Sequence, residues 1–344
     1  MVHLPLRLTL DGDALVANWH WLAHKSEGAA CGAAVKADGY GLGAREVVKR
    51  LQAAGCRDFF AATWAEAEAL APWPADLELS VLHGVLADDM AAALRSPARP
   101  VLNSVEQVAR WKETGRPCDV MVDTGINRLG LSASDAASGL LDGLKIETLM
   151  SHLACADEDS AANEAQRRAF EAVAGRVKAA RASLANSAGI CLGRDYAFDL
   201  TRPGIALYGG VPRREVEGHI RQVARIEAQI LQRRRVEAGD PVGYGGTFVA
   251  DRPRELAIVN LGYADGYLRG FSGTGRARIG DGFAPVVGRV SMDLTAICVD
   301  AAPELSEGDW IELDYDLPSA SSQSGLSQYE LLTTLGARFE RIWR

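Results

Sequence analysis

The chain has 344 residues, of which 48% are hydrophobic and 24% charged, and its formal net charge is −8. This composition is typical of a folded globular protein, and the length predicts about two domains. The negative charge argues against nucleic acid or an anionic membrane as partner, because either needs a basic protein surface. A small-molecule ligand is therefore expected.

The six cysteines are scattered, with no CxxC pair and no spacing typical of a disulfide scaffold or a zinc site. His20 and His24 lie four residues apart but have no third ligand nearby, so no metal site is predicted. The first residues lack a signal-peptide cleavage pattern, and no run of about 18 apolar residues occurs. We therefore expect a cytoplasmic protein with reduced cysteines.

Between about residues 30 and 210, short β-rich runs alternate with amphipathic helical patterns, a rhythm typical of βα units on a parallel sheet. The predicted strands are 32–37, 58–63, 77–84, 99–103, 119–124, 146–153, 182–187 and 205–210. Eight parallel strands close a barrel, so the pattern predicts an α/β fold with a TIM-like (β/α)8 barrel.

Beyond about residue 215 the helical periodicity fades, and short alternating stretches are separated by Gly, Pro and Arg. We therefore predict a barrel domain over 1–215 and a mostly β domain over 216–344, with the first ~10 residues able to pair with the second domain. Residues 317–328 are interpreted as a polar loop before a last amphipathic segment at 329–343.

Function in such a barrel lies at the carboxyl ends of the strands. Lys36 ends the first predicted strand, where burial lowers the pKa of an amine and makes it a nucleophile for an aldehyde. Ser187 ends the seventh strand, and Gly204 and Ile205 enter the eighth, where barrels commonly bind phosphate. A reactive lysine beside a phosphate site indicates pyridoxal 5′-phosphate (PLP) held as a Schiff base, although Lys36 alone would read as a lysine reaching solvent.

Eight motifs, in the same order, resemble those of the alanine racemases over nearly the full chain. They are AVKADGYGLG, VDTGINRLG, SHLACADE, LANSAG, TRPGIALYG, VGYGGTF, GYADG and GRVSMD. The resemblance implies that Lys36 holds PLP and that Tyr40 contacts the phosphate together with Ser187, Gly204 and Ile205. It also implies that Arg202 faces the pyridine nitrogen, to which an arginine donates a hydrogen bond without giving up its proton.

Racemisation needs an acid and a base on opposite faces of the α-carbon. The resemblance implies that Lys36 serves one face and Tyr244, from the partner subunit of a homodimer, serves the other. His152 would link the tyrosine to Arg202. The substrate contacts that the resemblance implies are Arg128, the backbone at Met292 across the dimer, and Tyr263 near the entrance.

One position departs from the family pattern. Many alanine racemases carry a carbamylated lysine two residues before the Asp of the DTG motif, where this chain has Met121. Arg128 thus loses its usual anchor, and a bound anion, another carboxylate or nothing replaces it.

The main interpretation is a PLP-dependent alanine racemase that supplies D-alanine for the cell wall or acts in L-alanine catabolism. Because of Met121, a serine racemase or one of broader specificity remains an alternative. A PLP carrier without turnover is less favoured, because such carriers resemble only the first ~220 residues. A related decarboxylase is also disfavoured, because its cysteine-bearing site has no match here.

Overall fold

The computed structural model describes residues 3–344, and within them the chain forms two compact units. The barrel unit comprises Leu15–Leu207 and Val211–Arg221. The β unit comprises the chain up to Ala14, Tyr208–Gly210 and Gln222–Arg344.

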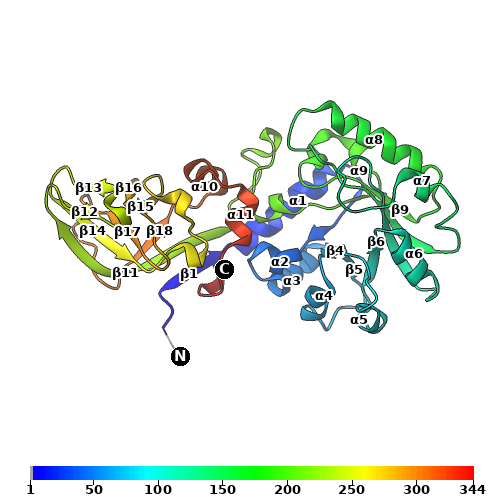
Figure 1. The fold of residues 1–344 in the computed structure, drawn as a ribbon, viewed down its shortest axis with the longest axis horizontal. Coiled ribbons are helices and arrows are strands. Elements are labelled where there is room, and N and C mark those ends of the chain that lie inside the picture. Colours follow the sequence, from blue (N-terminus) through cyan, green and yellow to red (C-terminus); the bar gives the residue numbers. More distant parts are fainter. Residues whose placement is uncertain (1–2) are drawn as a thin grey trace. The chain divides into compact units, whose positions relative to one another are not determined.

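Parallel strands form the wall of the barrel unit (Figure 1). Within residues 15–221, one sheet runs in the order β3-β4-β5-β6-β7-β8-β9, and a second pairs β10 with β2. The strands are β2 (Ala30–Cys31), β3 (Ala33–Ala34), β4 (Asp58–Ala61), β5 (Glu78–Val81), β6 (Arg99–Leu102), β7 (Pro117–Met121), β8 (Lys145–Met150), β9 (Arg181–Ser183) and β10 (Leu200–Thr201).

Backbone hydrogen bonds on both sides of β10 close the ring. The Gly32 amide donates to the Thr201 carbonyl at 2.9 Å, and the Arg202 amide donates to the Ala185 carbonyl at 2.9 Å. Because β2 and β3 are consecutive pieces of the first strand, the described residues 15–221 supply eight strand positions. The predicted (β/α)8 barrel is confirmed.

The predicted eighth strand was wrong in position. Residues 205–210 were expected to be extended, but Ile205–Tyr208 form a 3₁₀-helix and the strand is Leu200–Thr201. The Leu207 amide donates to the Gly204 carbonyl at 2.9 Å, as a 3₁₀ turn requires. An apolar run reports burial, and these four residues are buried, but burial does not distinguish a strand from a short helix.

Helices and turns of the barrel unit follow its strands (Figure 1). Side chains of Thr63, Ser104, Ser132 and Ser160 accept backbone N–H groups at four helix starts and satisfy donors that the helix leaves unpaired. The helices are α1 (Gly12–Lys25), α2 (Lys36–Tyr40), α3 (Ala44–Ala54), α4 (Trp64–Ala69), α5 (Met90–Arg95), α6 (Val105–Lys112), α7 (Ala133–Ala136), α8 (Ala161–Ala174), α9 (Arg194–Ala197), η1 (Gly189–Leu192), η2 (Ile205–Tyr208) and η3 (Arg214–Val216).

The β unit contains a mainly antiparallel sheet in the order β14-β17-β16-β15-β18-β11-β1-β19. The N-terminal strand β1 lies inside this sheet, antiparallel to β11 and parallel to β19. Its strands are β1 (Leu6–Leu10), β11 (Ala224–Val236), β14 (Arg254–Val259), β15 (Arg276–Ile279), β16 (Gly282–Val287), β17 (Thr295–Cys298), β18 (Trp310–Leu313) and β19 (Glu340–Trp343), beside the small pair β12 (Pro241–Val242) and β13 (Phe248–Val249).

Two expectations near the C-terminus were wrong. Leu317–Ser324, within the predicted polar loop, form helix α10, because the Asp316 side chain caps its start and a proline stands in its first turn. The predicted amphipathic segment at 329–343 is divided between helix α11 (Gln328–Thr333) and strand β19. The other helices of the β unit are the short η4 (Tyr244–Gly246), η5 (Tyr263–Asp265) and η6 (Arg269–Phe271).

The position of β1 predicts a strong dependence of stability on its core side chains. Leu8 is fully buried, so Leu8→Ala should lower the free energy of unfolding by about 2–5 kcal/mol through lost burial and a residual cavity. Leu231→Ala is the matched control, because Leu231 is 41% exposed on β11 and should cost less than about 0.5 kcal/mol. Urea unfolding measures both, and equal losses would contradict the assignment of β1 to the core.

Candidate active site

Lys36 lies at the carboxyl end of the first barrel strand. The strand ends at Ala34, two residues earlier than Lys36 and not at 37 as predicted, and Lys36 is the first residue of α2. Despite its label, α2 is a left-handed turn: Ala37 has φ 52° and ψ 46°, Asp38 has φ 51° and ψ 50°, and Tyr40 has φ 56°. Each such residue costs about 1–2 kcal/mol relative to a right-handed conformation. The turn therefore needs support from its surroundings.

The left-handed turn brings Tyr40 to a cluster of hydroxyl and amide groups. Tyr40 is buried, and a Cβ placed on Gly204 would lie 2.2 Å from its hydroxyl oxygen. The Gly204 amide donates to Ser187 Oγ at 2.8 Å, and the Ala206 amide donates to the same oxygen at 3.3 Å. Ile205 is buried between these two amides in the chain. Residue 204 must be glycine for the Tyr40 hydroxyl to lie this close to the backbone. The hydroxyls of Tyr40 and Ser187 and the nearby backbone amides are the kinds of donor that bind phosphate oxygens.

Arg202 follows β10 and is buried. Its guanidinium donates hydrogen bonds to Ser183 Oγ and to the Ser151 carbonyl, and Ser183 Oγ in turn donates to the Leu200 carbonyl. Burial lowers the pKa of Arg202 to about 10, with the Asp119 carboxylate acting in the opposite direction. Arg202 thus stays charged near neutral pH and is held in place by two neighbouring strands.

Three cations surround His152, which follows β8. Burial first, and then the charges of Arg202, Arg128 and Lys36, lower the pKa of His152 to about 3. The ring is therefore neutral at physiological pH, and can relay hydrogen bonds but carries no charge.

The same environment acts on Lys36. Burial and then the charge of Arg128 lower the pKa of the Lys36 amine below its usual range, while Glu66 acts in the opposite direction. A larger fraction of the amine is neutral than for an exposed lysine, and only the neutral form attacks an aldehyde or accepts a proton.

Arg128 is exposed in the loop after β7. Its amide donates to Asp123 Oδ2 at 3.2 Å, but no carboxylate lies within ion-pair distance of its guanidinium among residues 3–344. Met121 is buried at the end of β7. Thioether and guanidinium form no ion pair, so the described chain offers Arg128 no charged anchor.

The remaining predicted site residues belong to the β unit. Tyr244 begins η4 and is 69% exposed, and Met292 is 53% exposed. Tyr263 begins η5 and is partly buried, with the Arg269 guanidinium 5.2 Å from its ring centre. Both side chains are therefore largely open to solvent in the described chain.

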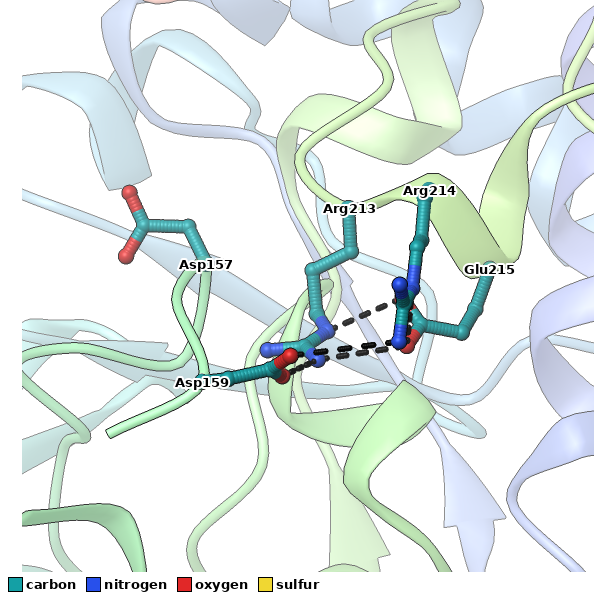
Figure 2. Close-up of a pocket in the computed structure, with 5 residues that line it drawn as sticks. All are labelled: Asp157, Asp159, Arg213, Arg214 and Glu215. Carbon is teal, nitrogen blue, oxygen red and sulfur yellow. Dashed lines mark hydrogen bonds and ion pairs between the residues drawn. The ribbon is translucent and has the colours of Figure 1, made fainter. Parts of the chain in front are cut away.

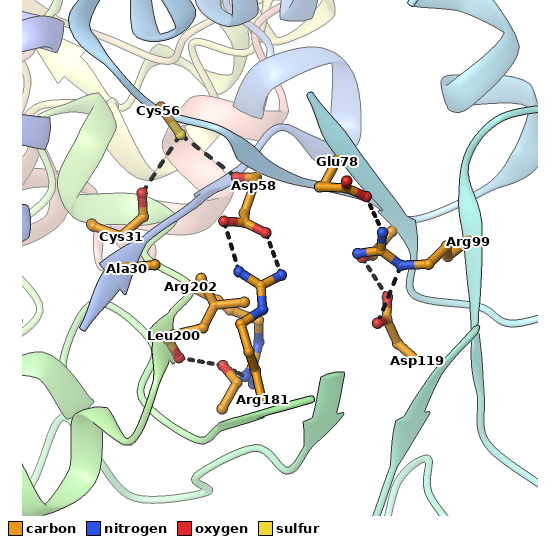
Figure 3. Close-up of polar contacts among 12 residues, drawn as sticks. Ala30, Cys31, Cys56, Asp58, Glu78, Arg99, Asp119, Arg181, Leu200 and Arg202 are labelled. Carbon is orange, nitrogen blue, oxygen red and sulfur yellow. Dashed lines mark hydrogen bonds and ion pairs between the residues drawn. The ribbon is translucent and has the colours of Figure 1, made fainter. Parts of the chain in front are cut away.

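A polar network inside the barrel was missed by the sequence reasoning (Figure 3). Arg181 donates to both carboxylate oxygens of Asp58, at 2.6 and 3.1 Å, and Ser80 Oγ donates to the fully buried Asp119 at 2.6 Å. Arg99 lies 3.4 Å from Asp119. The available signal was the presence of charged residues inside otherwise apolar strands, which is costly unless they are paired.

A second charged cluster secures the segment that follows β8 (Figure 2). Arg213 donates to the carbonyls of Ala156 and Glu158, at 2.9 and 3.0 Å, and pairs with Asp159 and Glu215. The cavity there, of about 220 Å³, is lined by Asp157, Asp159, Arg213, Arg214 and Glu215. Because each nitrogen of the Arg213 guanidinium has a partner, we interpret the cluster as a structural contact that holds residues 156–159 in place.

No helix in residues 3–344 has both the length and the apolar character to cross a membrane. In the same residues, no group of three or more His, Cys, Asp and Glu side chains is arranged to hold a metal ion.

Comparisons with known proteins agree on one family. Residues 10–212 match the model of the alanine racemase N-terminal domain, and residues 223–343 match that of the C-terminal domain. An alanine racemase of Acidiphilium cryptum is 42% identical, with 97% of this chain and 98% of that protein covered. A biosynthetic alanine racemase of Agrobacterium fabrum is also 42% identical, with 98% and 93% covered.

The crystal structure of alanine racemase from Bartonella henselae, with covalently bound pyridoxal phosphate, is similar over 99% of both chains. Its TM-score is 0.92 and its sequence identity is 35%.

The surroundings of His152 predict that its ring does not titrate in the ordinary range. With a pKa of about 3, it should show no protonation step between pH 5 and 8 in ¹⁵N NMR spectra, because the cations and burial disfavour the charged ring. His152→Gln identifies the signal by its disappearance. A midpoint near 6.5 for that signal would contradict the described charge environment.

Proposed function

The chain belongs to the alanine racemase family and interconverts the enantiomers of alanine with PLP, and we propose that Lys36 and the partner subunit's Tyr244 exchange the α-proton. The observation that carries the proposal is a partly buried lysine of lowered pKa at the end of a barrel strand, in the same unit as a cluster of hydroxyl and amide donors.

The residues present fit PLP. Gly204 leaves room where a Cβ would collide with Tyr40, and the two hydroxyls of Tyr40 and Ser187 lie with backbone amides in a pattern suited to a phosphate group. We propose that Tyr40, Ser187, Gly204 and Ile205 hold the phosphate and that Lys36 binds the aldehyde. PLP supplies a conjugated ring that makes the α-proton of a bound amino acid acidic.

Arg202 would face the pyridine nitrogen. Its hydrogen bonds to Ser183 and to the Ser151 carbonyl fix the guanidinium, and a pKa of about 10 keeps its proton in place near neutral pH. Arg202 therefore donates a hydrogen bond without transferring a proton, which leaves the ring a weaker electron acceptor than a protonated one. This favours return of the proton to the α-carbon over side reactions.

The two bases would lie on opposite faces of the α-carbon. Lys36 Nζ takes or returns the proton on one face, and its lowered pKa supplies the neutral amine that this requires. The Tyr244 hydroxyl acts on the other face from the partner subunit, where the neutral ring of His152 connects it to the charge of Arg202. The exposure of Tyr244 in one chain supports a role across a homodimer interface.

Arg128 and the backbone at Met292 of the partner subunit would bind the substrate carboxylate, and Tyr263 would lie at the entrance. Because Arg128 is exposed and has no carboxylate partner in the described chain, its guanidinium is available to bind the substrate carboxylate. A PLP carrier is disfavoured, because the C-terminal domain bearing Tyr244 and Met292 also matches the family.

We also propose a cytoplasmic location. The six cysteines form no disulfide among residues 3–344, and burial raises the pKa of the thiols of Cys31 and Cys191 to about 11. Unpaired, unreactive thiols suit a reducing compartment.

Lys36→Ala should abolish both alanine racemisation and the PLP adduct that borohydride fixes to the protein, because the amine that binds the aldehyde is gone. Lys49→Ala is the control, since the Lys49 side chain is 75% exposed on α3 and should keep both properties. Mass spectrometry of the reduced protein measures the adduct. A full yield of reduced adduct on Lys36→Ala would remove Lys36 from the mechanism.

Mixing two inactive variants tests the shared site. Lys36→Ala and Tyr244→Ala subunits, mixed equally and allowed to exchange, should form about half heterodimers, each with one intact and one doubly damaged site. Recovered activity should approach about a quarter of the wild-type value. If exchange is proven by mass and no activity returns, Tyr244 does not act across the interface.

A further inference from the structure

The left-handed turn that begins at Lys36 is supported by a carboxylate from the first turn of helix α4. Glu66 Oε1 accepts the Ala37 amide at 2.8 Å, one residue after Lys36. Glu66 Oε2 accepts the Ala62 amide at 2.6 Å, in the loop that follows β4. One side chain thus joins the chain segments that follow the first and second barrel strands.

Local structure fixes the position of Glu66. It is the third residue of α4, where it completes a capping box: its own amide donates to Thr63 Oγ1 at 3.2 Å, and its carboxylate accepts the Thr63 amide at 3.4 Å. A capping box needs only this reciprocal pair. The bond to Ala37 lies outside the box and spans 29 residues of sequence, so it serves the turn and not α4.

The far end of the turn is fastened separately. Asp38 Oδ1 accepts the Ala44 amide at 2.8 Å, and the Asp38 carbonyl accepts the Gly43 amide at 2.8 Å, which ties the turn to the start of α3. Three non-glycine residues with positive φ, Ala37, Asp38 and Tyr40, follow Lys36 in this turn. Their backbone conformation determines how far the Lys36 amine lies from the Tyr40 hydroxyl. The turn therefore sets the spacing between the proposed aldehyde and phosphate contacts.

Charge gives Glu66 a second influence on Lys36. Among the groups that act on the Lys36 amine, burial and Arg128 favour its neutral form, and Glu66 favours its ammonium form. His152, the other titratable group that interacts with Lys36, is neutral because its pKa is about 3. Glu66 is thus the carboxylate that balances the cations around Lys36.

We propose that Glu66 is a positioning residue for Lys36, whose carboxylate holds the left-handed turn through the Ala37 amide. This rests on the proposed role of Lys36 as the PLP-binding base. A base that is too weak captures the α-proton poorly, and a base displaced from the reacting atoms acts slowly. Glu66 opposes both effects, because its charge favours the ammonium form of Lys36 and its hydrogen bond to Ala37 holds the turn.

Three variants separate the two effects of Glu66. Glu66→Gln has the same shape but removes the charge and one of the two acceptor oxygens. Glu66→Asp keeps the charge but shortens the side chain, so it should lose the contact with Ala37. Glu68→Gln is the matched control, because Glu68 is exposed two residues further along α4.

Two readouts do not depend on turnover. The first is hydrogen exchange of the Ala37 amide in the PLP-free protein, which should become faster in Glu66→Gln and Glu66→Asp and stay unchanged in Glu68→Gln. The second is the pH dependence of borohydride trapping of added PLP on Lys36. Its midpoint should move to lower pH in Glu66→Gln, because loss of the negative charge favours the neutral amine, and should stay near the wild-type value in Glu66→Asp.

Turnover supplies the third readout. In Glu66→Gln, kcat should fall by on the order of ten-fold or more, because the base is both weakened and displaced, while KM for alanine changes little. An unchanged trapping midpoint or unchanged Ala37 exchange in Glu66→Gln would overturn the proposal. If Glu66→Gln does not fold, unchanged Ala37 exchange in Glu66→Asp overturns it instead. Wild-type protein that traps no PLP on Lys36 would contradict the proposed function, whereas the exchange data would still test the support of the turn.

Discussion

The concentration of positive charge at the carboxyl ends of the barrel strands is the constraint on which the site depends. Lys36, Arg128 and Arg202 act together on His152, and the burial of Arg202 limits the water that would screen its charge. Burial and then neighbouring positive charge lower the pKa of His152 and of Lys36. As a result, Lys36 and His152 are shifted toward their neutral forms, whereas Arg202 remains charged near neutral pH.

The barrel strands and the turn after Lys36 hold these basic side chains in place. Arg202 donates hydrogen bonds to Ser183 Oγ and to the Ser151 carbonyl on neighbouring strands. The barrel interior also contains the paired Asp58 and Arg181. Lys36 begins a turn whose left-handed residues are costly and persist because hydrogen bonds at both ends hold them. An anionic ligand would relieve the repulsion among the cations, so ligand binding and local stability are expected to be coupled.

Much of this could be predicted from the sequence. The βα rhythm predicted the barrel, which is confirmed, and motif likeness indicated Lys36, Tyr40, Ser187 and Gly204 as candidate site residues, which all lie in the barrel unit. The eighth strand was misplaced because the apolar run at 205–208 is buried in a 3₁₀-helix, and apolar pattern reports burial and not backbone shape. Glu66 had no signal of its own, because its bond to Ala37 depends on the tertiary proximity of helix α4 and the turn after Lys36.

The central claim is that Lys36 is a lysine with an unusually available neutral amine, and competitive acetylation of the PLP-free protein across pH tests it most directly. The labelled peptide that carries Lys36, quantified by mass spectrometry, should show a reactivity midpoint below the usual lysine value of 10.5, because burial and Arg128 disfavour the ammonium. A midpoint at or above 10.5 would contradict the account of the site.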